Sequence, residues 1–306
     1  MMSDMVEMLA SGLRMTIPVL ITALGAIYSE RSGVTNIGLE GMMLTGAFWG
    51  AYGALHYGPV NGVLLAIVMA MVMALIHGIV TVTYRVDQIV SGIALNILAF
   101  GLSRFFSLEL FGMATTSPHV ESLTKINIPI LQEIIFLKPL ATDISPIIII
   151  GIVLVFSTYW ILEKTTFGLR LKAVGENPLA ADTLGIKVLA YRYYGVLISG
   201  AFAGLAGAYL AIEHTGMYVE GMTQGKGYIA LAAMIFGNWN PFGALGAACL
   251  FGVAEASSLR VVQNSMIPYQ FIKMLPYVLT LLVLAGIVRK NQPPAAVGIP
   301  YSREDN

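Results

Sequence analysis

Long apolar runs without a single charged residue alternate with shorter polar stretches along this chain. A helix needs about 20 apolar residues to cross the hydrocarbon of a bilayer, so runs of this length predict membrane-spanning helices. Two of the runs are long enough for a pair of helices and contain turn signals, His56–Pro59 in one and Gly237–Pro241 in the other. The stretches free of Asp, Glu, Lys and Arg are residues 15–29, 41–84, 88–103, 144–162, 193–212 and 227–254.

These runs predict an all-α polytopic membrane protein with about nine helical segments and a single membrane domain over residues 1–306. The second, seventh and eighth segments are rich in glycine and are interpreted as transmembrane or partly re-entrant. Irregular backbone is tolerated at membrane depth only where protein or water covers it. The predicted segments are about 10–29, 39–56, 59–84, 88–109, 144–163, 190–212, 226–238, 242–259 and 268–288.

Composition supports lipid as the main solvent of the fold. Among the 306 residues, charged residues are 11% and hydrophobic residues 57%, whereas charged residues make up about a quarter of soluble domains. The 17 basic and 17 acidic residues balance, which excludes a nucleic-acid binder with a strongly basic surface. The one cysteine, Cys249, excludes an internal disulfide and a cysteine-based metal site, and no His, Asp and Glu set has metal-ligand spacing.

Lysine and arginine set the expected orientation, because cytoplasmic loops carry an excess of both. Five basic residues lie in 164–192 and three follow residue 288, so both regions are expected in the cytoplasm. Counting the spans back from these regions places the 110–143 loop and the N-terminus outside. The start of the chain agrees, because Asp4 and Glu7 precede the first basic residue, Arg14. The acidic start also argues against a cleaved signal peptide.

The loop between the fifth and sixth predicted spans contains signals for a short helix. Asn177-Pro178 is a typical helix start, with Asn as the N-cap and Pro at the first helical position. Leu179–Leu184 would form one or two turns, and Gly185 would end them. By physics alone, this element is equally compatible with a docking helix at the cytoplasmic face and with an ordinary capped loop.

Four stretches together resemble one protein family. The segment Phe167–Ile186, which reads FGLRLKAVGENPLAADTLGI, is similar to the coupling region of permease subunits of bacterial ATP-binding cassette (ABC) importers, in the branched-chain amino acid and simple-sugar permease family. Glu30–Met42, Ile198–Gly207 and Gly227–Gly237 resemble further stretches of the family, in the same order. The resemblance covers roughly residues 12–290. A single Gly-rich stretch is weak evidence, because Gly and Ala are common in membrane helices.

The finer resemblance is to the nucleoside branch of this family. The early loop ERSGVTNIGLEG and the tail Pro293–Tyr301, which reads PPAAVGIPY, are similar to stretches of that branch. The chain lacks the Gly-Gly-Ile-Asp-Leu-Ser pattern that sugar permeases usually have in the early loop. The resemblance therefore implies nucleoside uptake, with simple sugars or branched-chain amino acids as alternatives.

The resemblance also implies partners and roles for particular residues. The chain would bind an ABC ATPase, a second permease subunit and an extracytoplasmic, lipid-anchored substrate-binding protein, in the bacterial plasma membrane. It is expected to be a transport subunit without cofactor, since its nearest approach to a phosphate-binding loop, Gly221–Gly227, lacks the Ser or Thr after Lys226. ATP and magnesium would bind the ATPase. The expected coupling residues are Arg170, Gly175, Glu176, Asn177, Pro178, Ala180, Ala181, Gly185 and Ile186.

Three polar residues in the predicted spans or next to them are candidates for the solute pathway. Glu40 lies among small residues that allow close helix approach, so it either fixes a central helix or faces the pathway. Asn36 and Asn96 could bond a ribose or a base, or could bond neighbouring helices. Other ionisable residues at span ends, such as Arg104, Glu109, Glu255 and Arg260, are interpreted as interfacial.

Two other classes of function remain as alternatives. A secondary transporter working alone would be expected to show inverted repeats and charged residues at the membrane midplane, and neither is evident in the sequence. A membrane enzyme would need paired carboxylates or a histidine cluster at one face, and neither appears.

Overall fold

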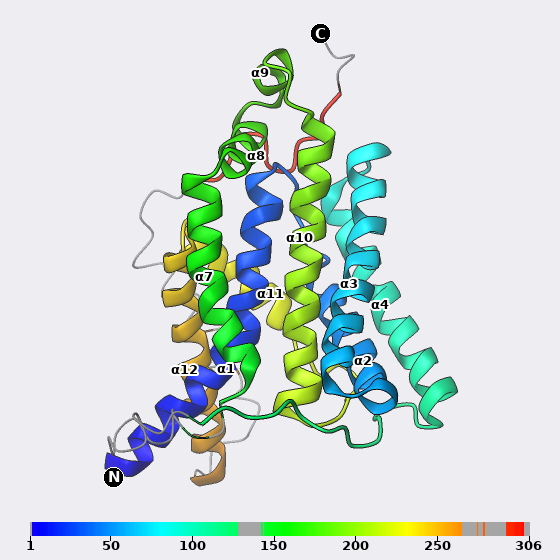
Figure 1. Ribbon diagram of the computed structural model, residues 1–306, viewed down its shortest axis with the longest axis vertical. Helices are drawn as coiled ribbons and strands as arrows, with labels where there is room; N and C mark the ends of the chain where they lie inside the picture. Colours follow the sequence, from blue (N-terminus) through cyan, green and yellow to red (C-terminus); the bar gives the residue numbers. More distant parts are fainter. Residues whose placement is uncertain are drawn as a thin grey trace.

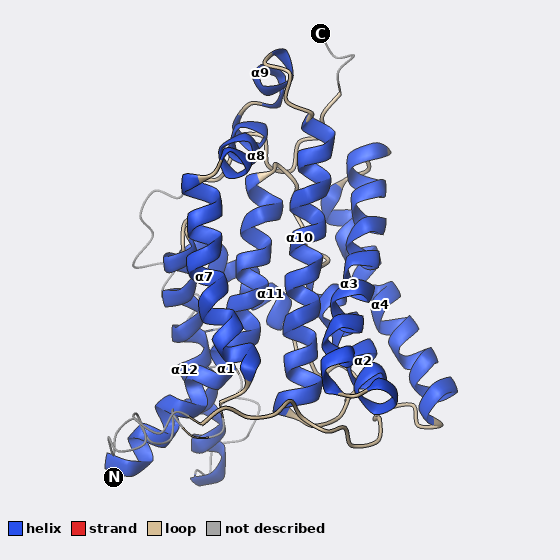
Figure 2. Ribbon diagram, in the orientation of Figure 1, coloured by secondary structure: helices blue, strands red, loops and turns tan. Residues whose placement is uncertain are grey.

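The computed structural model describes residues 2–127, 142, 144–264, 274, 278 and 292–302, and this part of the chain is helical (Figure 2). Its extended pairing is limited to two isolated bridges, Thr116 with Val219 and Ile126 with Ile144. The described helices are α1 (Met2–Arg31), α2 (Leu39–Tyr57), α3 (Pro59–Gly78) with the π-helical η1 (Ile79–Thr83), α4 (Gln88–Phe111), α7 (Pro146–Lys164), α8 (Thr166–Glu176), α9 (Pro178–Thr183), α10 (Val188–Ala208) with the π-helical η2 (Tyr209–His214), α11 (Lys226–Phe236) and α12 (Pro241–Asn264).

Five helices of the described part are long and apolar enough to cross a membrane, which confirms the prediction of an all-α, multi-pass membrane protein. They are Val6–Arg31, Pro59–Thr83, Gln88–Phe111, Pro146–Lys164 and Val188–His214. The ninth predicted segment, 268–288, lies outside the described residues apart from positions 274 and 278, as do the basic residues of the tail.

Two turn predictions are confirmed by the backbone. Gly58 has a φ of 83° between α2 and α3, and Pro59 occupies the first turn of α3. The predicted break before Pro241 separates α11 from α12, where Asn238 and Trp239 both have positive φ values of 53° and 54°.

The helix α11 is too short to cross the bilayer. Its 11 residues span roughly 16 Å, about half of the hydrocarbon thickness. The non-helical segments 32–38 and 215–225 precede α2 and α11. Protein covers the first of them, because Asn36 is fully buried, so this irregular backbone satisfies the requirement for burial at membrane depth.

Two ends of the bundle are distinct in Figure 1. The helices α8 and α9, the last turn of α1 and the segment 292–302 gather at one end, hereafter the α8–α9 end. The start of α1 and the 112–127 loop lie at the opposite end. α1 and α10 lie side by side in the centre and share extensive contacts, with α7 and α12 on one side and α2, α3 and α4 on the other.

Candidate functional site

The first candidate site is the junction at which α2 and α11 begin. The Glu40 carboxylate accepts three hydrogen bonds there. Oε1 accepts from the Thr223 hydroxyl (2.6 Å) and the Gly225 amide (2.8 Å), and Oε2 accepts from the Gly227 amide (2.7 Å). A helix N-terminus carries unsatisfied N–H groups and a partial positive charge, so a carboxylate stabilises it. Glu40 therefore caps α11.

Asn96 of α4 connects the same junction to the early loop. Its Oδ1 accepts from the Gly41 amide (2.8 Å), and its Nδ2 donates to the Ile37 carbonyl (3.1 Å) and to the Tyr228 hydroxyl (2.8 Å). Tyr228 of α11 is 46% exposed, whereas Asn96 is half-buried. The exposed phenol beside an amide is thus the part of this junction that lies at the surface of the chain.

Asn36 lies deeper than the other two pathway candidates. It is fully buried, and its Nδ2 donates to the Ser199 hydroxyl of α10 (2.7 Å). Its Oδ1 has no hydrogen-bond partner among the described residues. This contact joins the early loop to α10. It corresponds to the second of the two roles considered for Asn36, a bond to a neighbouring helix.

The second candidate site consists of α8 and α9. The predicted short helix is confirmed: Asn177 Oδ1 accepts from the Ala180 amide (3.0 Å) as the N-cap, and Pro178 is in the first turn. Gly185 has a φ of 78°, which any side chain would strain, and it follows the end of α9. No helix predicted from the sequence corresponds to α8, whose N-cap Thr165 accepts a hydrogen bond from the Gly168 amide.

The predicted coupling residues divide into an inner and an outer set. Gly175 is buried against the end of α1, where a Cβ would clash with the Arg31 carbonyl oxygen. Ala181 is also buried, against Val174 and Val188. These neighbours belong to this chain, and Ala181 is 2% exposed, so it presents almost no surface to a partner.

The outer set forms an exposed surface on the α8–α9 end. Leu184 is 80% exposed and Leu179 is 41% exposed, with Ala180 between them in the chain. Glu176, Asn177 and Gly185 are exposed at the two ends of α9, Arg170 is exposed on α8, and Pro178 and Ile186 are half-buried. Exposed leucines beside polar groups make this surface suited to docking another protein.

Two of the residues interpreted as interfacial, Glu255 and Arg104, form ion pairs. Glu255 pairs with Lys226 (2.6 Å), and the side chain of Arg260 lies outside the described part. Arg104 lies 3.4 Å from Glu220. These partners are far apart in the sequence, so periodicity alone could not have paired them.

Trp239, in the turn between α11 and α12, is buried. Its indole Nε1 donates to Glu30 Oε2 (2.6 Å), and both residues are under a tenth exposed. Arg31 donates to the Trp239 carbonyl (3.5 Å) and lies 3.9 Å from Glu176. The turn between α11 and α12 is thereby joined to the end of α1 and, through Arg31, to α8.

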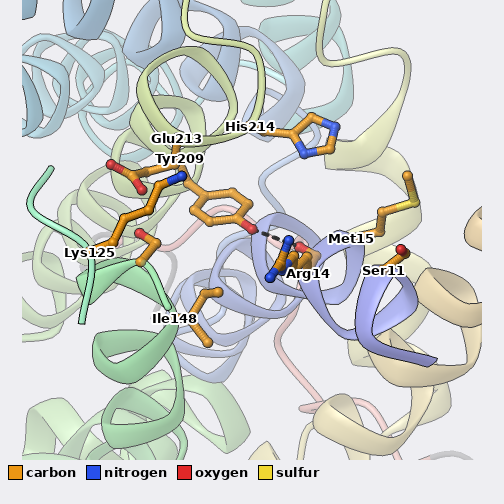
Figure 3. A pocket seen from close by; sticks show the side chains of 9 residues that line it. Ser11, Arg14, Met15, Lys125, Ile148, Tyr209, Glu213 and His214 are labelled. Carbon is orange, nitrogen blue, oxygen red and sulfur yellow. Dashed lines mark hydrogen bonds between the residues drawn. The ribbon is translucent and has the colours of Figure 1, made fainter. Parts of the chain in front are cut away.

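A polar cavity of about 300 Å³ opens near the opposite end of the bundle (Figure 3). The Tyr209 hydroxyl donates to the Arg14 carbonyl (3.1 Å), and Glu213 Oε1 accepts from the Leu123 amide (2.8 Å). These contacts join η2 to α1 and to the 112–127 loop. The cavity contains none of the predicted site residues; it is lined by Ser11, Arg14, Met15, Lys125, Ser145, Ile148, Tyr209, Glu213 and His214.

Comparisons with known proteins agree with this architecture. The guanosine ABC transporter permease protein NupQ of Bacillus subtilis (strain 168) is 42% identical, covering 93% of this chain and 92% of that protein. The nucleoside ABC transporter permease protein NupC of Lactococcus lactis is 40% identical over 93% of each chain. A Haloferax volcanii permease with glucose in its name is 31% identical, over 93% of this chain and 94% of that one.

No solved structure matches the chain significantly. The family model described as "Branched-chain amino acid transport system / permease component" matches residues 8–284. This match covers nearly all of the described helices and both candidate sites. The chain therefore belongs to the permease-component family of branched-chain amino acid transport systems, as a multi-pass membrane transport subunit.

Proposed function

We propose that this chain is the permease subunit of an ABC importer for nucleosides in a bacterial plasma membrane. The observation that carries the substrate class is the match over 93% of the chain to two permeases named for guanosine and nucleosides, at 42% and 40% identity. The glucose-named relative is more distant, at 31% identity. Sugars are therefore the second candidate class.

The pairing of the charged groups at the junction of α2 and α11 supports the assignment of an uncharged solute. In transporters, the N-termini of broken helices commonly point at anionic groups of the substrate. In this chain, Glu40 already occupies the N-terminus of α11, and Lys226 is paired with Glu255. The junction thus offers Tyr228 and Asn96, which are neutral, and it favours a nucleoside or sugar over an amino-acid carboxylate.

The transport mechanism follows from the two candidate sites. The exposed surface of α9 would dock an ABC ATPase, which binds ATP and magnesium, on the cytoplasmic side. A lipid-anchored binding protein would deliver the solute at the opposite end. A second permease chain would complete the pathway, with Asn36, Glu40 and Asn96 close to it and Tyr228 at its surface.

An uptake experiment tests this proposal directly. The chain would be expressed with its ATPase, partner permease and binding protein in a strain without other nucleoside uptake. Radiolabelled guanosine, uridine and adenosine should accumulate in an ATP-dependent manner, whereas leucine and glucose should not. Uptake of leucine or glucose alone would contradict the nucleoside assignment.

A further inference from the structure

The segment 292–302, here called the C-terminal strap, runs across the α8–α9 end of the bundle (Figure 1). It contains the PPAAVGIPY stretch that resembles the nucleoside branch, and none of the roles assigned above uses it. Ala296, Tyr301 and Ser302 are buried, so the strap is packed into the fold at these positions.

Backbone hydrogen bonds join the strap to three separate elements. The Gln292 amide donates to Asn238 Oδ1 (3.0 Å) in the turn between α11 and α12. The Ala296 amide donates to the Gly175 carbonyl of α8 (2.9 Å). The Gly298 amide donates to the carbonyl of Gly33 (3.2 Å), just after α1. The Ala295 amide adds a longer bond to Glu176 Oε2 (3.3 Å).

Arg192 holds the far end of the strap to a fourth element, α10. It is only 1% exposed, and its Nη1 donates to the Ile299 carbonyl (2.9 Å). Its guanidinium carbon lies 5.9 Å from the centre of the Tyr301 ring, within cation–π range. Nε and Nη2 have no hydrogen-bond partner among the described residues.

A buried arginine whose side chain contacts only one carbonyl and one ring contributes little to the stability of the fold. Desolvating a guanidinium is costly, and an apolar side chain of similar volume is often neutral or stabilising at such a position. The contacts of Arg192 are instead specific to the strap. We propose that Arg192 is a positioning residue that clamps the strap, so that α1, α8, α10 and the α11–α12 turn move as one unit when an ATPase displaces α9.

This inference rests on the proposed function, because it concerns transmission of movement from the ATPase. Within the clamped unit, α11 extends from the turn at Trp239 to the Glu40 cap, where Tyr228 meets Asn96. A displacement at α8–α9 would therefore reach the junction of α2 and α11 through the length of one short helix. Without the strap, the turn would keep its contacts to Glu30 and Arg31 but lose the one to residue 292.

The test compares Arg192→Met with the matched control Lys164→Met in the purified importer reconstituted in proteoliposomes. Lys164 is an exposed cation at the end of α7, and it has no hydrogen bond or ion pair to the described residues of the strap. Nucleoside imported per ATP hydrolysed should fall by at least about fivefold in Arg192→Met, the lower range of typical coupling between sites. Its thermal midpoint and its assembly with the ATPase should stay at or above those of the parent.

Two truncations provide a second test of the clamp. A chain ending at residue 291 lacks the strap and should lose coupling as Arg192→Met does. A chain ending at Ser302 keeps the strap and should import at the parental ratio. An unchanged ratio in Arg192→Met, or loss of coupling in the chain ending at Ser302, would overturn the proposal. A parent importer that moves no nucleoside would instead contradict the proposed function.

Discussion

Replacing Glu40 with glutamine should destabilise the start of α11 while leaving the size of the side chain unchanged. The glutamine side chain keeps one oxygen that can accept from Thr223 or Gly225. Its NH2 group, however, then faces a backbone N–H donor, such as that of Gly227. A buried donor left without an acceptor costs about 1–3 kcal/mol. Removing a negative charge from a helix N-terminus costs about 0.3–1 kcal/mol, and up to about 2 kcal/mol in buried geometry.

The sum is about 1.3–4 kcal/mol for Glu40→Gln. One kcal/mol shifts the melting temperature of a domain of 150–250 residues by about 2–4 °C, so at the lower value, which suits this longer chain, we expect a decrease of roughly 3–8 °C. Melting would be followed by tryptophan fluorescence in detergent at a fixed scan rate, since unfolding in detergent is often irreversible. Hydrogen exchange at residues 225–228 should rise in the same variant.

The matched control is Glu109→Gln, an exposed glutamate near the end of α4. A surface substitution usually changes the free energy of unfolding by less than about 0.5 kcal/mol, so the melting temperature of this control should stay close to that of the parent. Equal melting temperatures and unchanged exchange in the two variants would refute the cap. If Glu40 contacted the solute instead, Glu40→Gln would change the KM for import without loss of protection in α11.

Three further experiments test the orientation, the docking surface and the buried turn. In a cysteine-free background, an impermeant thiol reagent applied to intact cells should label Ser122→Cys but not Thr183→Cys; the reverse pattern would overturn the orientation. Ala180→Glu places a charge on the exposed surface of α9. Import and transport-stimulated ATP hydrolysis should therefore fall together when the variant is expressed at the normal level. A variant that still binds its ATPase and imports at the parental rate would exclude this surface from coupling. Trp239→Phe removes the indole donor from the buried carboxylate of Glu30 and should cost about 1–3 kcal/mol in thermal unfolding, whereas an unchanged midpoint would show that another group satisfies the carboxylate.

Local signals account for the parts of the fold that could be predicted. The apolar runs before and after Arg85 predict α3 and α4 because lipid exposure leaves little place for charge along a spanning helix. Asn177, Pro178 and Gly185 define α9 because capping depends on residues within one turn of the helix end. Neither inference required knowledge of a neighbouring helix.

The parts that could not be predicted depend on partners distant in sequence. The charge count treats Arg192 as one basic residue of a cytoplasmic loop, but the only hydrogen bond of its side chain to a described residue is to Ile299, 107 positions later. Lys226 and Glu255 belong to different helices whose packing decides the pair. A charge count reports the sign of a loop, and it cannot report which buried group a charge meets.

The short helix α11 shows why the junction of α2 and α11 is the hardest part of this fold to predict. Its apolar residues continue into those of α12, so hydropathy alone gives one long run that is broken by Gly237–Asn240. The N-terminus of α11 carries no capping side chain of its own, because Gly225 is the N-cap residue. The cap comes from Glu40, 185 residues earlier than Gly225. A glutamate at the start of one helix therefore acquires its role only when folding brings it to the start of another, and this is why the sequence left a structural and a pathway role open for Glu40.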